Sequence, residues 1–279
     1  MLPTANPFPG STVTLLGSTT TYEPSGLALA KGKLYLASDD GYIYLYDHAD
    51  NAWHEVFADK GADFESLTYS KGKLMAGVEK NKEPEIVRLA ASSDGSLRKT
   101  SSWILELPKG VNAGDMEAMT FVPEEYCPFG RAKHYGGFFF AAFQSCLGKI
   151  FVYDLPKGKG RRGITGNKPI CAYTVAVRMA ASDMCFANGV LYVLFDDNVT
   201  TNILAACTTH RKEEKLTLQK QYGLPKENGS SSNYEGLAVD GQTIYLSRDD
   251  NAKPADNAVY YCPSTSIFPE GDLPSQNCD

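Results

Sequence analysis

The stretch Asn233-Tyr234-Glu235-Gly236-Leu237-Ala238-Val239 recurs in altered form four more times along the chain. Each copy has a Ser or Glu, in most cases a small residue after it, and then the apolar start of a strand. The other copies are Glu23-Pro24-Ser25-Gly26-Leu27-Ala28-Leu29, Asp63-Phe64-Glu65-Ser66-Leu67-Thr68-Tyr69, Asp115-Met116-Glu117-Ala118-Met119-Thr120-Phe121 and, the weakest, Ala180-Ala181-Ser182-Asp183-Met184-Cys185-Phe186. The leading residues are therefore Ser25, Glu65, Glu117, Ser182 and Glu235.

The sequence that follows each copy repeats as well. In every copy except the third, a short turn leads into an apolar strand that ends in an acid 14 residues after the leading residue. These acids are Asp39, Glu79, Asp196 and Asp249. The third copy carries an insertion and reaches Gln144 instead. Repeats spaced 40 to 65 residues apart, each with several short strands, are typical of a β-propeller.

We therefore expect an all-β protein, a single five-bladed β-propeller that occupies residues 1–279. The last blade has only three strands of its own, so a strand at residues 10–17 should supply the fourth and close the ring. Closure would remove the free sheet edge of an open circle. The expected blades are 22–58, 63–107, 115–176, 180–221 and 233–263, followed by a tail at 264–279.

Composition narrows the function classes. A hydrophobic content of 43% and a charged content of 22% are ordinary for one globular domain. The net charge of −6 argues against nucleic-acid binding, which needs a basic face. No apolar run reaches the ~18 residues of a membrane-spanning helix. The sequence has no P-loop, dinucleotide fingerprint or Gly-x-Ser-x-Gly elbow.

The seven cysteines bear on the compartment. None lies in a CxxC pair or at metal-ligand spacing with a histidine. We expect Cys185 to be a small buried residue of an inner strand and the other six to be available for disulfides, with Cys262 and Cys278 the most suggestive pair. Together with glycosylation acceptors at Asn198 and Asn228, this favours a secreted or extracytoplasmic protein, although the N-terminus lacks the features of a signal peptide.

The geometry of a propeller predicts that the repeated residues gather at one mouth of the central channel. The innermost strand of each blade lines the central channel and the next strand runs antiparallel, so the start of the first and the end of the second share one mouth. The leading residues should form a ring around the axis, with Asp39, Glu79, Gln144, Asp196 and Asp249 in a wider ring. Carboxylates this close take up protons unless a cation neutralises them, and an all-oxygen ring suits Ca²⁺. Two simpler alternatives remain open: the leading residues only hydrogen-bond neighbouring blades, and the outer acids are turn residues.

A family resemblance adds to this prediction. The five motifs, from Pro24-Ser25-Gly26-Leu27 to Tyr234-Glu235-Gly236-Leu237, resemble those of the SdiA-regulated propeller family. Their Ser, Glu, Glu, Ser, Glu order is similar to that of calcium-activated nucleotidases (apyrases), five-bladed propellers with Ca²⁺ in the central tunnel. The resemblance, which runs from about Tyr22 to about Asp250, implies that Ser25, Glu65, Glu117, Ser182 and Glu235 ligate calcium. Asp183 and Cys185 depart from the family pattern.

Two functions remain open. In the first, a hydrolase, Ca²⁺ orients a phosphate or ester oxygen while Asp39, Glu79, Asp196 and Asp249 activate water or hold a second metal. In the second, a non-catalytic binding or scaffold propeller, Ca²⁺ only clamps the blades. In both we expect a monomer with a small-molecule substrate or ligand at the mouth. Separately, the basic stretch 157–163 is either a phosphate-binding loop or a solvated turn.

Overall fold

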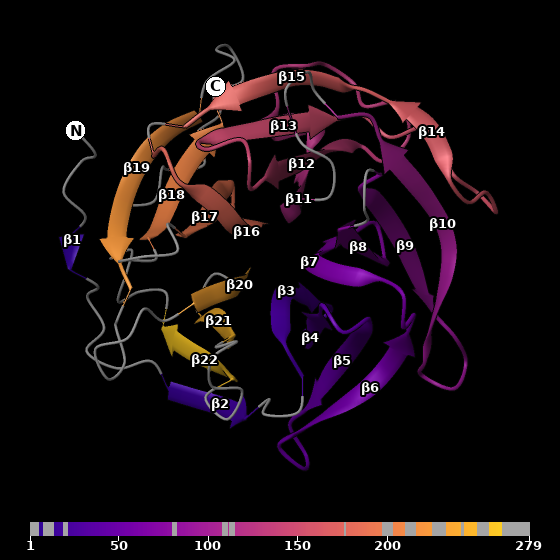
Figure 1. Ribbon diagram of the computed structural model, residues 1–279, viewed down its shortest axis with the longest axis vertical. Coiled ribbons are helices and arrows are strands. Elements are labelled where there is room, and N and C mark those ends of the chain that lie inside the picture. The colour runs from indigo at the N-terminus through magenta and orange to yellow at the C-terminus, as the bar shows by residue number, and fades with distance from the viewer. Residues whose placement is uncertain are drawn as a thin grey trace.

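The protein is all-β, with sheets arranged around a central axis as in a β-propeller (Figure 1). The computed structural model describes residues 6–7, 14–18, 22–79, 83–107, 111, 115–175, 177–196, 203–209, 216–224, 233–240, 243–249 and 257–263. Within these ranges the one helical element is the short 3₁₀ turn η1 (Glu124–Tyr126). No helix among them is long and apolar enough to cross a membrane.

The described strands form five sheets. The first contains β3 (Pro24–Ala30), β4 (Lys33–Ser38), β5 (Tyr42–Asp47) and β6 (Ala52–Ala58). The second contains β7 (Asp63–Ser70), β8 (Lys73–Glu79), β9 (Glu85–Ala91), β10 (Leu97–Leu105) and β14 (Ile164–Asn167). The third contains β11 (Met116–Pro123), β12 (Gly137–Phe143), β13 (Lys149–Tyr153) and β15 (Pro169–Thr174).

The remaining two sheets combine strands from both ends of the chain. The fourth contains β16 (Ala180–Ala187), β17 (Val190–Asp196), β18 (Ile203–Thr209), β19 (Leu216–Gly223) and, at its edge, β1 (Asn6–Pro7). The fifth contains β20 (Asn233–Val239), β21 (Thr243–Asp249), β22 (Ala258–Pro263) and β2 (Thr14–Ser18). Four sheets thus draw their four main strands from one stretch of chain, and the last draws only three.

The innermost strands are β3, β7, β11, β16 and β20, which surround the axis in Figure 1. Each contacts the next in this order, and β20 contacts β3. Each also pairs antiparallel with the strand that follows it. The starts of the inner strands and the ends of their partners therefore lie at one end of the central channel, as the sequence predicts.

The N-terminal strand β2 lies at the outer edge of the fifth sheet. It pairs antiparallel with β22, from Thr14 opposite Tyr261 to Ser18 opposite Ala258. Its Leu16 carbonyl accepts a hydrogen bond from the Tyr46 hydroxyl of the first sheet at 3.2 Å. The expected strand at 10–17 is thus observed from residue 14 to residue 18, and residues 10–13 lie outside the described ranges.

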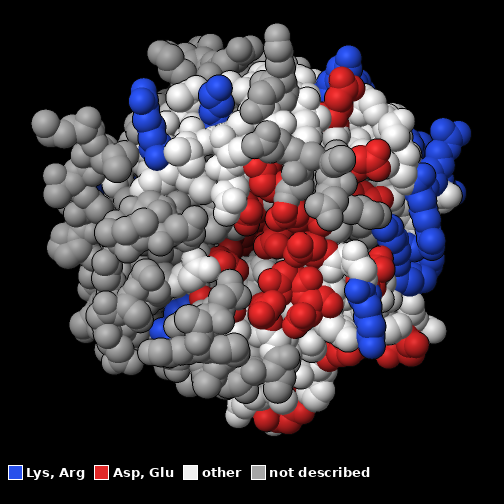
Figure 2. Space-filling model, in the orientation of Figure 1, with Lys and Arg blue, Asp and Glu red and all other residues white. Residues whose placement is uncertain are grey.

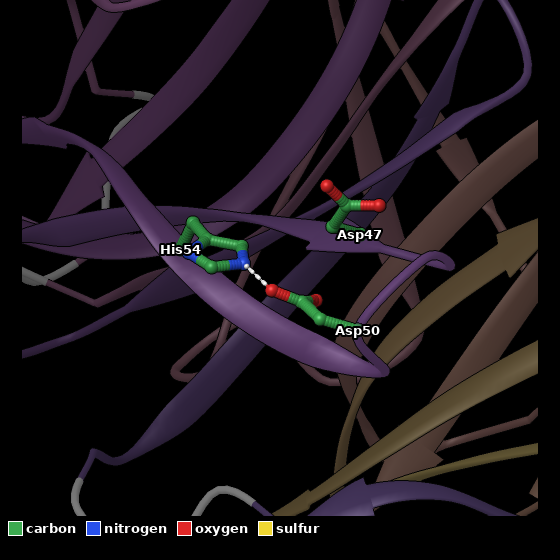
Figure 3. Close-up of side chains that lie close together, drawn as sticks. All are labelled: Asp47, Asp50 and His54. Atoms are coloured by element: carbon green, nitrogen blue, oxygen red, sulfur yellow. Dashed lines mark hydrogen bonds and ion pairs between the residues drawn. The ribbon is translucent and has the colours of Figure 1, made fainter.

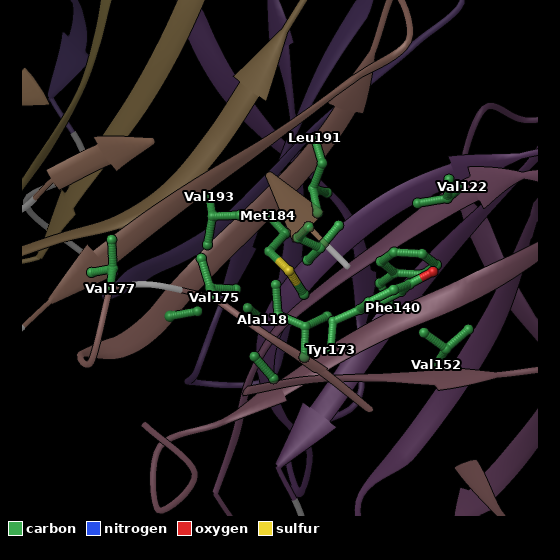
Figure 4. Packing of buried hydrophobic residues seen from close by; sticks show 14 of the residues in the cluster. Ala118, Val122, Phe140, Val152, Tyr173, Val175, Val177, Met184, Leu191 and Val193 are labelled. Atoms are coloured by element: carbon green, nitrogen blue, oxygen red, sulfur yellow. The ribbon is translucent and has the colours of Figure 1, made fainter. Parts of the chain in front are cut away.

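The hydrophobic core lies between neighbouring sheets. Between the third and fourth sheets, Phe140, Tyr173 and Met184 pack with Leu191 and Val193 (Figure 4). Comparable clusters join the second to the third, the first to the second, the fourth to the fifth and the fifth to the first. Since each fully buried Leu, Val or Phe contributes about 1.5–3 kcal/mol, these interfaces supply the main stabilisation of the ring.

Two edge strands were not expected from the sequence. The segment after the basic loop forms β14, which pairs in parallel with β10 through Trp103 opposite Ile164 and Leu105 opposite Asn167. The segment Asn6–Pro7 likewise adds to β19 as β1. An edge strand presents unpaired backbone groups to any extended segment that reaches it. Local sequence patterns do not reveal such pairings because the two partners are far apart in the chain.

Candidate metal centre at the channel mouth

A β-bulge marks the leading residue of every repeat. In β7, Phe64 pairs with Val78 and Ser66 with Gly77, so Glu65 has no partner opposite it. Pairing skips Glu117, Ser182 and Glu235 in the same way. In β3 the pairing jumps from Pro24 to Leu27, so the irregularity spans Ser25 and Gly26.

These bulges explain how the leading residues reach the channel. A bulge adds one residue to a strand, bends it and turns the side chain out of the regular alternation. The sequence pattern predicts that the leading residues come just before the inner strands. In the structure they lie within these strands instead. Gly26 and Gly236 follow two of them, and a Cβ at either would collide with the backbone or side chains of the neighbouring sheet. The small residue after the leading one thus has a packing reason.

Acidic side chains gather at the mouth where these residues lie (Figure 2). The pKa of the Glu65 carboxyl is raised well above its usual value, first by burial and then by the nearby charge of Glu117. Asp63 and Glu235 add to the effect. The structure therefore brings Glu65, Glu117 and Glu235 together, and their charges repel one another.

The two leading serines differ in their contacts. The Ser182 hydroxyl donates a hydrogen bond to the Tyr234 carbonyl at 3.0 Å, which is the inter-blade role left open as an alternative. The Ser25 hydroxyl is 1% exposed and its oxygen has no hydrogen-bond partner. Ser182 thus ties two sheets together, whereas Ser25 leaves a buried oxygen to be satisfied.

The outer ring is partly formed as predicted. Burial, and then the charge of Glu23, raises the pKa of Asp39 to about 8. Burial, and then the charge of Asp63, raises the pKa of Glu79 to about 7. Asp249 is buried and lies near Asp39. Gln144 is exposed, and its backbone N–H donates to the backbone carbonyl of Asp115 at 2.9 Å. Asp196 ends β17, but its side chain lies outside the described part of the structure.

Sequence reasoning missed a third set of acids, Glu23, Asp63 and Asp115. Each lies two residues before a leading residue. The ligand atoms of Asp63, Glu65 and Glu79 lie within 4.8 Å of one another, as do those of Glu23, Asp39 and Asp40. The signal was available, because the first position of three of the five motifs is acidic. The prediction used only the leading position of each motif and therefore did not include these acids.

The donor set fits a hard cation. Asp63 lies directly opposite Glu79, a like-charge pair that destabilises a sheet unless it is neutralised. The Oδ1 atoms of Asp39, Asp63 and Asp115 are buried and lack a hydrogen-bond partner within the described residues. The same is true of the Ser25 hydroxyl oxygen. Buried polar atoms of this kind are rare in folded proteins. All the candidate ligands are oxygens, which suits Ca²⁺ with its ~6–8 ligands and flexible geometry.

Asp183 lies just inside the mouth and is completely buried. Its Oδ2 accepts hydrogen bonds from the amides of Leu237 at 2.7 Å and Leu27 at 3.4 Å, and its Oδ1 accepts one from its neighbour Met184 at 2.8 Å. Burial raises the pKa of Asp183 well above its usual value, while these hydrogen bonds oppose the rise. Asp183 thus joins the first, fourth and fifth sheets across the channel.

Beyond Asp183 the side chains that line the channel are uncharged. A cavity of about 230 Å³ is lined there by the later residues of the inner strands, among them Leu29, Tyr69, Phe121, Phe186 and Val239. Cys185 also lines it, and burial raises the pKa of this thiol to about 12. The thiol therefore stays protonated at neutral pH. Cys185 lies on an inner strand as expected, but it is half-buried rather than fully buried.

The expected disulfides are absent from the described residues. Cys127, Cys146, Cys171, Cys185 and Cys262 form no disulfide within the described part of the structure. Cys127 is buried in the core cluster between the third and fourth sheets, where it packs as a small apolar side chain. The side chain of Cys207 and all of Cys278, the suggested partner of Cys262, lie outside the described ranges.

A second cluster of candidate ligands is formed by Asp47, Asp50 and His54 (Figure 3). All three are exposed. Asp47 accepts the amide of Ala49 at 2.8 Å and Asp50 that of Ala52 at 3.1 Å, while Asp50 also contacts His54 at 2.8 Å. These carboxylates stabilise the β5–β6 turn, so the cluster has a structural explanation.

No family model matches the sequence, and no curated protein sequence matches it. Solved structures match almost its whole length. Glutaminyl cyclase of Myxococcus xanthus is 9% identical over 90% of this chain and 94% of its own, with a TM-score of 0.56. The PQQ-bound aldose sugar dehydrogenase of Streptomyces coelicolor is 13% identical over 92% and 99%, with a TM-score of 0.51. A putative oxidoreductase (glucose dehydrogenase) of Thermus thermophilus is 12% identical over 91% and 100%, also with a TM-score of 0.51. At such identities the similarity shows the propeller fold alone.

Proposed function

We propose that this protein is a calcium-binding, five-bladed β-propeller whose ring is closed by the pairing of β2 with β22. Ser25, Glu65, Glu117, Ser182 and Glu235 surround the ion at the channel mouth. The observation that carries the proposal is the coincidence of a bulge with each of these residues at one end of the channel. Five equivalent departures from regular pairing serve one purpose, which is to aim five oxygen ligands at the axis.

Electrostatics favour a bound cation. Without one, burial and mutual repulsion raise the pKa values of Glu65, Asp39 and Glu79. A divalent cation removes the repulsion and gives a partner to the buried Ser25 oxygen, which lacks a hydrogen bond within the described residues. Calcium fits better than Mg²⁺, because residues from five separate strands do not impose a strict octahedron. Extracellular modules bind calcium at ~10⁻⁴–10⁻³ M, which suits the extracytoplasmic location that we propose.

The same mouth provides a place for a small substrate with a phosphate or ester group. A calcium ion held from one side has open positions towards solvent, where a substrate oxygen can bind and be polarised. In the calcium-free protein, burial and neighbouring acids raise the pKa of Asp39 to about 8 and that of Glu79 to about 7. A bound cation favours the ionised form of these carboxyls, which is the form that a general base needs. Asp249 and Asp196 complete the proposed set. The low-identity neighbours include enzymes, and the SdiA-regulated and nucleotidase resemblance points to the same mouth.

The proposal is tested in two steps. Metal analysis of the purified protein, followed by calorimetric titration of chelator-treated protein with CaCl₂, should show one calcium site per chain. Glu117→Gln should abolish it, whereas Glu55→Gln, an exposed carboxyl on β6, should not. Turnover of nucleoside diphosphates and carboxylic esters is then measured with and without calcium. Calcium binding without turnover would favour the non-catalytic propeller, and no calcium binding would overturn the proposal.

A further inference from the structure

A second cavity, of about 510 Å³, lies away from the channel and is strongly basic. It is lined by Lys73, Arg88, His134, Tyr135, Lys157 and Lys159. No acidic side chain is among these lining residues. The cations come from the second sheet and from the loop that follows β13 in the third, so the cavity spans two neighbouring sheets.

Arg88 is held in place by neutral groups. Its Nε and Nη2 donate to the hydroxyls of Thr100 and Ser101, each at 2.9 Å, and its Nη1 donates to the Tyr135 hydroxyl at 3.4 Å. The guanidinium also lies 5.9 Å from the centre of the Trp103 ring. A guanidinium fixed in this way is pre-oriented, and no carboxylate of the described part of the chain pairs with its positive charge.

The backbone of the basic loop is docked on the sheet, while the side chains of Lys157 and Lys159 are exposed. Trp103 Nε1 donates to the Pro156 carbonyl at 3.0 Å, and the Ser102 amide donates to the Arg161 carbonyl at 3.2 Å. The Ser101 hydroxyl donates to the carbonyl of Gly158. A Cβ at Gly158 would overlap the Trp103 ring, so glycine is required for this close approach. Three consecutive residues of β10 thus fix the loop that carries Lys157 and Lys159.

Within the described residues, no ion pair balances the charges of this cavity. The ion pairs formed within the described ranges join Asp50 to His54, Glu85 to Lys99, Asp154 to Lys133 and Glu106 to Lys168. None of them involves Lys73, Arg88, Lys157 or Lys159. Four cations around one cavity repel each other and persist most readily where an anion binds.

Strand direction places the cavity far from the calcium mouth. β7 and β13 run away from the mouth, so Lys73, which follows the β7 hairpin turn, and the loop after β13 lie at the opposite end of the propeller. His134 and Tyr135 precede β12, which starts at that same end. The two regions therefore carry opposite charge at opposite ends.

We propose that this cavity binds a multiply charged oxyanion, a phosphate or sulfate ester, with Arg88 as the fixed fork and Lys73, Lys157 and Lys159 as mobile cations around it. Arginine matches the geometry of such an anion with two parallel hydrogen bonds, and lysines add charge. The Tyr135 ring and hydroxyl offer a contact for the part of the ligand that bears the ester. The site does not depend on calcium at the mouth.

The test uses full-length protein, stripped of metal and dialysed free of chelator, so that the probe cannot bridge to calcium. Inorganic pyrophosphate and inorganic sulfate are titrated separately by calorimetry at low ionic strength. Whichever binds more strongly shows whether the cavity prefers a phosphate or a sulfate group. Lys157→Gln combined with Lys159→Gln should weaken binding about tenfold or more. Lys73→Gln should act in the same direction. These lysines are exposed, so the variants should melt like the wild type.

Lys33→Gln is the matched control, because Lys33 begins β4 as Lys73 begins β8 but does not line the cavity. Its affinity should equal that of the wild type. In a ¹⁵N spectrum, pyrophosphate should shift the indole signal of Trp103 and leave that of Trp53, in the first sheet, in place. Absence of binding at millimolar probe, or an equal loss in the Lys33 variant, would overturn the proposal.

Discussion

The two ends of the central channel are built from the same five strands yet differ in chemistry. At the mouth, each inner strand is bulged and presents Ser or Glu, backed by acids such as Asp63 and Asp39. Four residues further along, the same strands are regular and present side chains such as Leu29, Tyr69 and Phe121. Buried apolar side chains of the inner strands stabilise the packing of neighbouring sheets. The first part of each strand can therefore carry charge that destabilises the fold. Asp183 lies at the boundary between the two.

The largest effect is expected at this boundary. Asp183→Ala would leave the amides of Leu27, Leu237 and Met184 buried without their acceptor. Since an unsatisfied buried donor costs ~1–3 kcal/mol, the free energy of unfolding should fall by roughly 3–5 kcal/mol. Urea denaturation measures this change, with Asp47→Ala in the exposed β5–β6 turn as the control. An Asp183 variant as stable as the control would show that the channel does not need this link.

Calcium should have the next largest effect, and only through the mouth. A ligand at 100 times its dissociation constant stabilises the folded state by ~2.7 kcal/mol, which should raise the melting temperature by several degrees. Glu117→Gln should remove most of this gain, and differential scanning calorimetry with and without CaCl₂ measures it. A full calcium response in Glu117→Gln would contradict the assignment of Glu117 as a ligand.

The pH dependence of the calcium-free protein should show the strain at the mouth. A carboxyl whose pKa is raised by folding destabilises the folded state once it ionises, so stability should be highest near pH 4–5. It should then fall as pH rises through about 7 and 8, the pKa values of Glu79 and Asp39. Melting temperatures between pH 5 and 9 test this, and saturating calcium should flatten the curve. A calcium-free protein that becomes more stable over this range would contradict it.

The smallest effect is expected at the uncharged end of the channel, beyond Asp183. Tyr69→Phe removes one hydroxyl from the lining of the channel cavity and should change the free energy of unfolding by less than ~0.5 kcal/mol. Calcium affinity should stay the same, because the substitution lies beyond the Asp183 link. A weakened calcium site in this variant would show that the two ends are not independent.

The sequence predicted the parts that repeat. The register of the motifs placed Glu65, Glu117 and Glu235 near one another because identical strand positions in a propeller face the same axis. It could not predict β14, whose partner β10 lies some 60 positions earlier and shows no local sign of the pairing. Nor did it reveal that the Asp183 carboxylate accepts hydrogen bonds from three backbone amides, since two of these donors, Leu27 and Leu237, lie on other sheets. The disulfide expectation at Cys127 failed because a buried thiol and a half-cystine look alike in sequence.

A crystal structure of the protein grown with CaCl₂ tests the central claim most directly. The account predicts one ion on the channel axis, with oxygens of Ser25, Glu65, Glu117, Ser182 and Glu235, directly or through water, at about 2.3–2.6 Å. The anomalous signal of calcium would identify the ion. A mouth that holds only water, with the carboxyl groups protonated and hydrogen-bonded to one another, would contradict the account.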